Sequence, residues 1–186
     1  FRVEKIDKNL VLALSKIKKE MMEMYPSQTW DGDIEAEEHV ETEINVMDDV
    51  VCLLFSGGLD SVTTSYRHLD RKQILVTIRG ADIKLKDDIG WGNVISAVNE
   101  YSQQLDSIPC FIESNFMEFI NYRVMNNISS AIPSWWVYVQ HGLGLSGMMA
   151  VPSYLNGATI GYIASSHSYE FGDNPWGSSP KIDNLI

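Results

Sequence analysis

The chain has 186 residues, of which 45% are hydrophobic and 21% charged, a balance typical of folded globular proteins and not of disordered ones. Its formal net charge of -11 argues against a nucleic-acid ligand, because proteins usually hold a phosphate backbone with clusters of lysine and arginine. The longest weakly charged stretch is broken by Pro133, Pro152 and several glycines, so no membrane-spanning helix is expected.

The first predicted element is an amphipathic helix over residues 5–24, where apolar residues such as Leu14 and Ile17 recur at helical spacing between charged ones. Pro26 is expected to end it. The acidic residues 29–49 follow, and we predict an exposed connector there with one short strand over residues 40–46.

The remainder of the chain alternates between strand and helix patterns. Residues 50–55 form a continuous apolar run of strand length, which is typical of a strand buried on both faces in a parallel sheet. Such alternation predicts an α/β fold with a parallel sheet, helices on both faces and right-handed crossovers. We expect an N-terminal segment of residues 1–48 and one domain of residues 49–186. Further strands are predicted at residues 73–78, 109–112 and 159–164, and helices at 60–69, 91–105, 117–130 and 135–154.

A glycine loop separates the first of these strands from the helix after it. A loop in this position offers backbone N–H groups and the positive end of a helix dipole, which together favour a phosphate or pyrophosphate. Gly57 and Gly58 let the backbone approach the anion, and Asp60 can cap the helix or hold a magnesium ion against the phosphates. The bland alternative is a glycine turn with an ordinary helix cap. The loop consists of Ser56, Gly57, Gly58, Leu59, Asp60 and Ser61, whose serines add hydroxyl donors.

This run, SGGLDS after an apolar strand, resembles the loop of N-type ATP pyrophosphatases, the PP-loop or adenine nucleotide alpha-hydrolase-like superfamily. It lacks the lysine of a Walker A loop and the spaced glycines of a dinucleotide site. The resemblance implies a three-layer sandwich with a mainly parallel, doubly wound, Rossmann-like sheet that binds ATP and Mg²⁺. In that superfamily the β and γ phosphates leave as pyrophosphate. The resemblance therefore implies an AMP-forming ligase that adenylylates a small-molecule substrate in an amide-forming or related reaction.

Other site residues are nominated by their place after the predicted strands, because ligands of open parallel sheets collect at the carboxyl ends of the strands. After the second strand these are Ile78, Arg79, Gly80 and Asp82, where members of the superfamily contact adenine and ribose. Arg79 could neutralise phosphate, hold a substrate carboxylate or form a surface ion pair. After the fourth strand they are Ser165, Ser166 and His167. The candidate catalytic residues are Asp60, Arg79 and His167, with Asp60 also the candidate magnesium ligand.

The tail, residues 175–183, is similar to a segment of proteins distantly like 7-cyano-7-deazaguanine synthase (QueC-like). Those proteins commonly continue into a zinc-binding cysteine cluster, which this sequence does not contain, so the domain is expected to be truncated at its C-terminus or to lack the cluster. Cys52 and Cys110 lie in apolar runs and are predicted to be buried, reduced thiols, which favours a cytoplasmic location.

The opening residue is Phe1 and no secretory pattern follows it, so we expect an excised fragment or a processed chain. The sequence leaves open two alternatives to an ATP-dependent ligase. One is a non-catalytic module that binds adenine nucleotides, and the other is a tRNA-modifying enzyme of the same superfamily, which the acidic charge disfavours. It also leaves a homodimer open.

Overall fold

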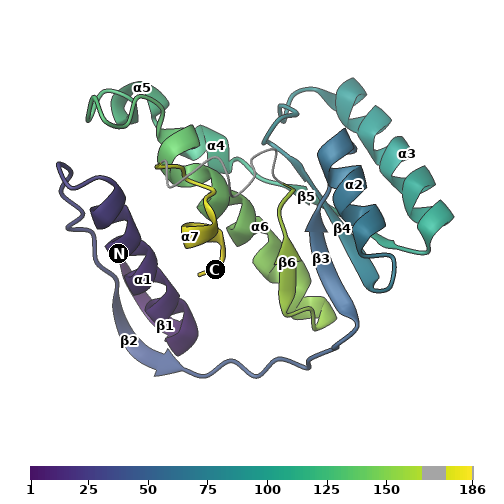
Figure 1. Ribbon diagram of the computed structural model, residues 1–186, viewed down its shortest axis with the longest axis horizontal. Coiled ribbons are helices and arrows are strands. Elements are labelled where there is room, and N and C mark those ends of the chain that lie inside the picture. Colours follow the sequence, from purple (N-terminus) through teal and green to yellow (C-terminus); the bar gives the residue numbers. More distant parts are fainter. Residues whose placement is uncertain (165–174, 186) are drawn as a thin grey trace. The chain divides into compact units, whose positions relative to one another are not determined.

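A computed structural model describes residues 1–164 and 175–185 (Figure 1). The chain divides into two compact units, which are described separately. The N-terminal unit comprises Phe1–Glu43, Asn121–Leu143 and the described part of Asp173–Ile186, and the sheet unit comprises Ile44–Ile120 and the described part of Gly144–Gly172. The first unit therefore joins residues 1–43 to two later segments, a grouping that composition along the chain does not reveal.

The sheet unit is built on a four-stranded sheet with the order β5-β4-β3-β6. All three pairings in it are parallel, and the pairing of β3 with β4 runs from Val50 opposite Lys72 to Leu54 opposite Val76. The predicted parallel sheet is therefore confirmed. Its strands are β3 (Val50–Leu54), β4 (Lys72–Arg79), β5 (Ile108–Glu113) and β6 (Ile160–Tyr162).

Helices cover both faces of this sheet, with α2 (Leu59–Arg67) and α3 (Asp88–Leu105) on one side and α6 (His141–Asn156) on the other (Figure 1). Side chains alternate between two hydrophobic clusters, as the pleat of a strand requires. Leu53 packs on the α3 side with Val98, whereas Cys52 packs on the α6 side with Met149. This arrangement is α/β and is compatible with three layers. The unit also contains the short helix α4 (Phe116–Phe119).

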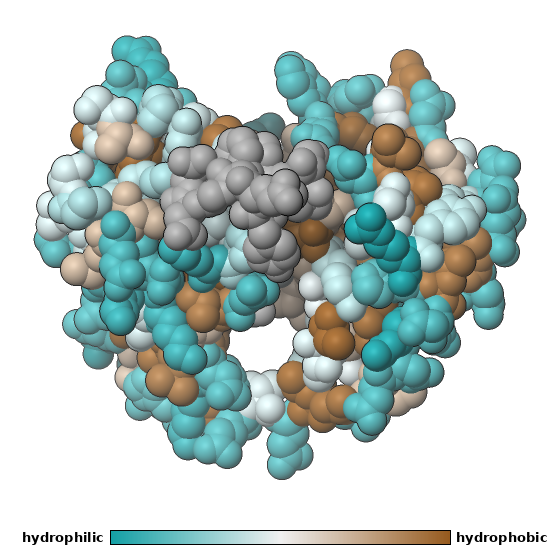
Figure 2. All heavy atoms as spheres, in the orientation of Figure 1, coloured by the Kyte–Doolittle hydropathy of each residue, from teal (hydrophilic) through white to brown (hydrophobic). Residues whose placement is uncertain are grey.

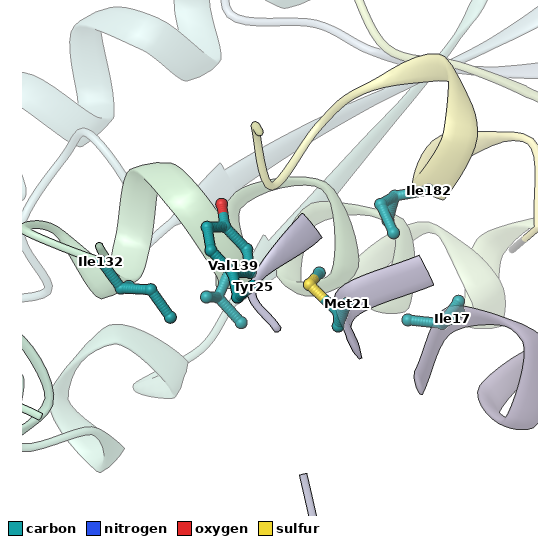
Figure 3. Packing of buried hydrophobic residues seen from close by; sticks show 6 residues of the cluster. All are labelled: Ile17, Met21, Tyr25, Ile132, Val139 and Ile182. Carbon is teal, nitrogen blue, oxygen red and sulfur yellow. The ribbon is translucent and has the colours of Figure 1, made fainter. Parts of the chain in front are cut away.

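The N-terminal unit has a core of its own beneath helix α1 (Lys8–Met24), which Figure 3 shows. The Tyr25 hydroxyl donates a 2.8 Å hydrogen bond to the backbone carbonyl of Tyr138, so the ring that fills this core also satisfies its polar end. Strand β1 (Arg2–Asp7) pairs in parallel with β2 (Glu35–Val40), and α1 connects the two. The buried side chains of the core are Ile17, Met21, Tyr25, Ile132, Val139 and Ile182. The remaining elements are α5 (Tyr122–Met125), the π-helical turn η1 (Trp136–Gln140) and α7 (Pro180–Asp183).

Several predicted boundaries are wrong for local reasons. The first helix begins at Lys8, because Arg2–Asp7 form a strand and the Asp7 carboxylate caps the helix by accepting from the N–H groups of Asn9 and Leu10. The short strand of the acidic connector lies at Glu35–Val40 and not at residues 40–46. The single helix predicted at residues 117–130 is two short helices, α4 and α5.

Both cysteines are reduced, and burial raises the pKa of each thiol. Cys52 is fully buried as predicted, whereas Cys110, on the outer strand β5, is half-buried. Many large apolar side chains lie outside these clusters and are exposed, among them Ile89, Phe119 and Leu155. On the face that Figure 2 shows, hydrophilic residues surround scattered hydrophobic ones.

Candidate phosphate-binding site

The glycine loop lies where the order of the strands reverses. The chain passes from β3 to β4 and then to β5 on one side of β3, and β6 pairs with β3 on its other side. In open α/β sheets the loops diverge beyond the carboxyl ends of the strands at such a reversal, and ligands bind in the crevice between them. Residues 55–58 leave the carboxyl end of β3 at this point.

The loop itself is exposed and is shaped by its glycines. Residues 56–60 are exposed, and the Leu59 side chain has 81% of its surface in solvent. Gly57 has a φ of +77°, a left-handed conformation that residues with a Cβ adopt at a cost. A Cβ at Gly57 would meet no atom within 4 Å, so the space beside this residue is open.

Two serine hydroxyls brace the loop from within. Ser61, which is buried, donates a 2.9 Å hydrogen bond from its Oγ to the carbonyl of Gly58, and the Gly58 N–H donates to Ser56 Oγ at 3.3 Å. The two hydroxyl oxygens lie 3.3 Å apart. These short-range bonds join residues within the loop itself.

The loop contains backbone donors that have no partner within the described protein. Gly58 is the N-cap of α2 and makes no side-chain capping bond. Among the described residues, the N–H groups of Ser56, Gly57 and Leu59 donate no hydrogen bond within the protein. Unpaired N–H groups at a helix N-terminus carry a positive partial charge and are suited to an anion. Asp60 adds an exposed carboxylate in the first turn of α2.

Arg79, at the end of β4, forms ion pairs with two carboxylates of its own unit. Its side chain is 9% exposed and forms ion pairs with Asp88, at the start of α3, and with Glu113 Oε1 at 3.3 Å. The hydrogen bond to Asp88 is the main cause that raises the pKa of Arg79. The guanidinium carbon also lies 5.9 Å from the centre of the Trp91 ring. Arg79 therefore ties β4, β5 and α3 together. Its own side chain is buried, whereas the side chains of its partners Asp88 and Glu113 are largely exposed.

The neighbours of Arg79 have structural roles that the sequence did not indicate. Ile78 packs in the hydrophobic cluster on the α6 side of the sheet. Gly80 has a φ of +99°, and a Cβ there would fall on the backbone of Ser114, so only glycine fits this turn. Asp82 lies exposed in the turn that follows.

The candidate residues Ser165, Ser166 and His167 lie outside the described residues. Within the described part of the chain, no three His, Cys, Asp or Glu side chains come together in a way that could hold a metal ion. The same part contains no helix that is long and apolar enough to cross a membrane.

One residue at this edge of the sheet was missed by the sequence analysis. Thr77 of β4 is buried, and its hydroxyl donates a 2.7 Å hydrogen bond to the carbonyl of Phe55, the residue that immediately precedes the loop. A threonine inside an apolar strand is ordinarily a β-former, so its spacing alone gives no sign of this contact.

No protein-family model matches the sequence, and searches of curated proteins and of solved structures returned no match.

Proposed function

We propose that this chain binds ATP by its pyrophosphate end at residues 56–61 and belongs to the PP-loop superfamily of ATP pyrophosphatases. One observation carries the proposal: an exposed SGGLDS loop leaves a central parallel strand at the point where the strand order reverses, with a left-handed glycine and unpaired N–H groups. On this proposal the sheet unit is an adenine nucleotide alpha-hydrolase-like, Rossmann-like domain.

The negative charge of Asp60 beside the loop favours ATP that is bound together with a cation. Asp60 is an acidic residue in the first turn of α2, where an incoming triphosphate would meet its negative charge. Mg²⁺ is commonly held by one or two carboxylates together with substrate phosphates, so Asp60 is a sufficient protein ligand even without a preformed cluster of acids. We therefore expect ATP to bind as its magnesium complex and to bind more weakly when the metal is chelated.

The proposed reaction is transfer of the adenylyl group of ATP to an oxygen of a small-molecule substrate, with release of pyrophosphate. The oxygen attacks the α phosphorus, the bond to the bridging oxygen of the β phosphate breaks, and the loop holds the departing pyrophosphate. Amide formation or a related ligation would follow and release AMP. Backbone donors that do not need to reorganise would stabilise the negative charge that accumulates on the leaving group.

The test is to incubate the protein with Mg-ATP and panels of carboxylate and amine compounds, and to measure AMP and pyrophosphate. Asp60→Asn is expected to lower their release by about tenfold or more, which corresponds to one lost electrostatic contact in the transition state. Asp70→Asn is the matched control. It removes the same negative charge from an exposed residue that lies beyond the C-terminal end of α2.

The outcomes separate the alternatives. ATP binding without AMP or pyrophosphate release under any condition would favour a non-catalytic nucleotide-binding module. Tight tRNA binding that weakens steeply with salt would favour a tRNA-modifying enzyme. Failure to bind ATP at all would overturn the proposal.

A further inference from the structure

The phosphate loop begins where the pairing of β3 with β4 ends. The last paired residues are Leu54 and Val76, and one further ladder bond follows, from the N–H of Phe55 to the carbonyl of Val76 at 2.8 Å. Beyond it the backbone of β3 turns away into the loop while β4 continues to Arg79. The carbonyl of Phe55 accepts its hydrogen bond from a side chain of β4 and not from the backbone: Thr77 Oγ1 donates to it at 2.7 Å.

This bond acts on the loop through the geometry of the peptide unit. The carbonyl of Phe55 and the N–H of Ser56 belong to one planar trans peptide, so the two groups point in opposite directions and cannot turn independently. A donor that holds the carbonyl on the Thr77 side therefore holds the N–H of Ser56 on the other side. That N–H is the first of the loop donors, and in the described structure it has no partner within the protein.

The rest of Phe55 is fixed independently. Its side chain is 3% exposed, and its ring lies 4.7 Å from the ring of Tyr101 of α3. Ring packing and the ladder bond hold the N–H side of Phe55, but the torsion angle between its α carbon and its carbonyl decides where the next peptide points. By donating to the Phe55 carbonyl, the Thr77 hydroxyl restrains that torsion angle.

We propose that Thr77 is a positioning residue of the phosphate loop, which orients the Ser56 N–H toward a bound pyrophosphate group by holding the Phe55 carbonyl. This rests on the proposed function, because it assigns a role within the same site. Valine has the shape of threonine without the hydroxyl, and serine keeps the hydroxyl without the methyl group. The pair therefore separates the hydrogen bond from packing.

The experiment uses inorganic pyrophosphate and ATP, each with Mg²⁺, and adenosine as a ligand without phosphates. Calorimetry is expected to show that Thr77→Val weakens pyrophosphate and ATP binding by about three- to tenfold, the equivalent of one hydrogen bond, and leaves adenosine binding unchanged. Thr77→Ser should bind all three ligands as the unaltered chain does.

Ser65→Ala is the matched control. Ser65 is fully buried in α2, and its hydroxyl donates a 2.6 Å hydrogen bond to Gln73 Oε1 of β4. Ser65→Ala therefore also removes a buried hydroxyl hydrogen bond, but one that joins α2 to β4 and does not involve the loop. Its pyrophosphate affinity should stay within about twofold of the unaltered chain. Unfolding curves of all three variants show how far each is destabilised.

A second readout does not need a ligand. The ¹³C chemical shift of the Phe55 carbonyl should move in Thr77→Val and stay in place in Ser65→Ala, because only the first variant removes its donor. Pyrophosphate affinity unchanged in Thr77→Val, or lowered equally in Ser65→Ala, would overturn the positioning role. If the unaltered chain bound neither pyrophosphate nor ATP, both the proposed function and this role would be overturned. If instead the Phe55 carbonyl shift did not move in Thr77→Val, the positioning role of Thr77 would be refuted and the proposed function would stand.

Discussion

Gly57→Ala separates what the loop contributes to folding from what it contributes to binding. Gly57 has a φ of +77°, and a Cβ at this position would meet no atom within 4 Å. A methyl group would therefore cause no steric clash in the unliganded protein. Its only effect on the fold would come from the left-handed backbone.

The magnitude follows from two opposing effects. A non-glycine residue in the left-handed region costs about 1–2 kcal/mol, and alanine restores roughly 0.4–1 kcal/mol by reducing the entropy of the unfolded chain. The net loss in the free energy of unfolding should therefore lie between about 0 and 1.6 kcal/mol. The methyl group would, however, stand in the open space beside the loop donors, where glycine allows an anion to approach the backbone. We expect pyrophosphate affinity to fall by about tenfold or more.

Gly92→Ala is the matched control for this variant. Gly92 lies within α3, and a Cβ there also meets no atom within 4 Å, so the same substitution should raise stability by about 0.5–1 kcal/mol. Urea unfolding and calorimetry with magnesium pyrophosphate measure the two quantities. If Gly57→Ala bound pyrophosphate as well as Gly92→Ala does, the open space beside Gly57 would not be the anion site.

Three further predictions concern buried side chains of the two units. Arg79→Met should lower the free energy of unfolding by about 1–3 kcal/mol, because it removes a buried guanidinium that pairs with the exposed carboxylates of Asp88 and Glu113. Arg67→Met on the exposed face of α2 should change it by no more than about 0.5 kcal/mol in urea unfolding. Burial raises the pKa of Asp183 from 3.8 to about 6, so the folded chain holds this proton more tightly and loses stability as the pH rises through that interval. Asp183→Asn should thus stabilise the chain more at about pH 7 than at about pH 4 in thermal unfolding, and an equal effect at both would contradict the burial of this carboxylate. A thiol-reactive disulfide reagent should leave Cys52 unmodified in the folded protein and modify it on unfolding; rapid reaction of the folded protein at Cys52 would contradict its burial.

The sheet and the loop were predictable because their signals are local. The apolar run from Val50 to Phe55 and the two glycines after it indicate a buried strand and a turn without any knowledge of the rest of the chain. The strand Arg2–Asp7 was missed because its side chains are mostly exposed and polar and show no clear apolar alternation. The Asp7 cap was a visible signal of the true helix start.

What the sequence could not supply are contacts between distant segments. The Phe55 carbonyl and the Thr77 hydroxyl are 22 residues apart, and only the register of β3 against β4 brings them together. The partners of Arg79 depend likewise on the pairing of β4 with β5 and on where α3 begins. Periodicity predicts which residues face a core, but not which strand lies beside which.

The most direct test of the proposed phosphate site is a ¹⁵N NMR titration of the unaltered chain with magnesium pyrophosphate. We expect saturable changes in amide shift that are largest at the loop residues Ser56, Gly57, Gly58, Leu59, Asp60 and Ser61. Saturable binding with its largest shifts elsewhere, or no shifts at this loop at millimolar pyrophosphate, would contradict it.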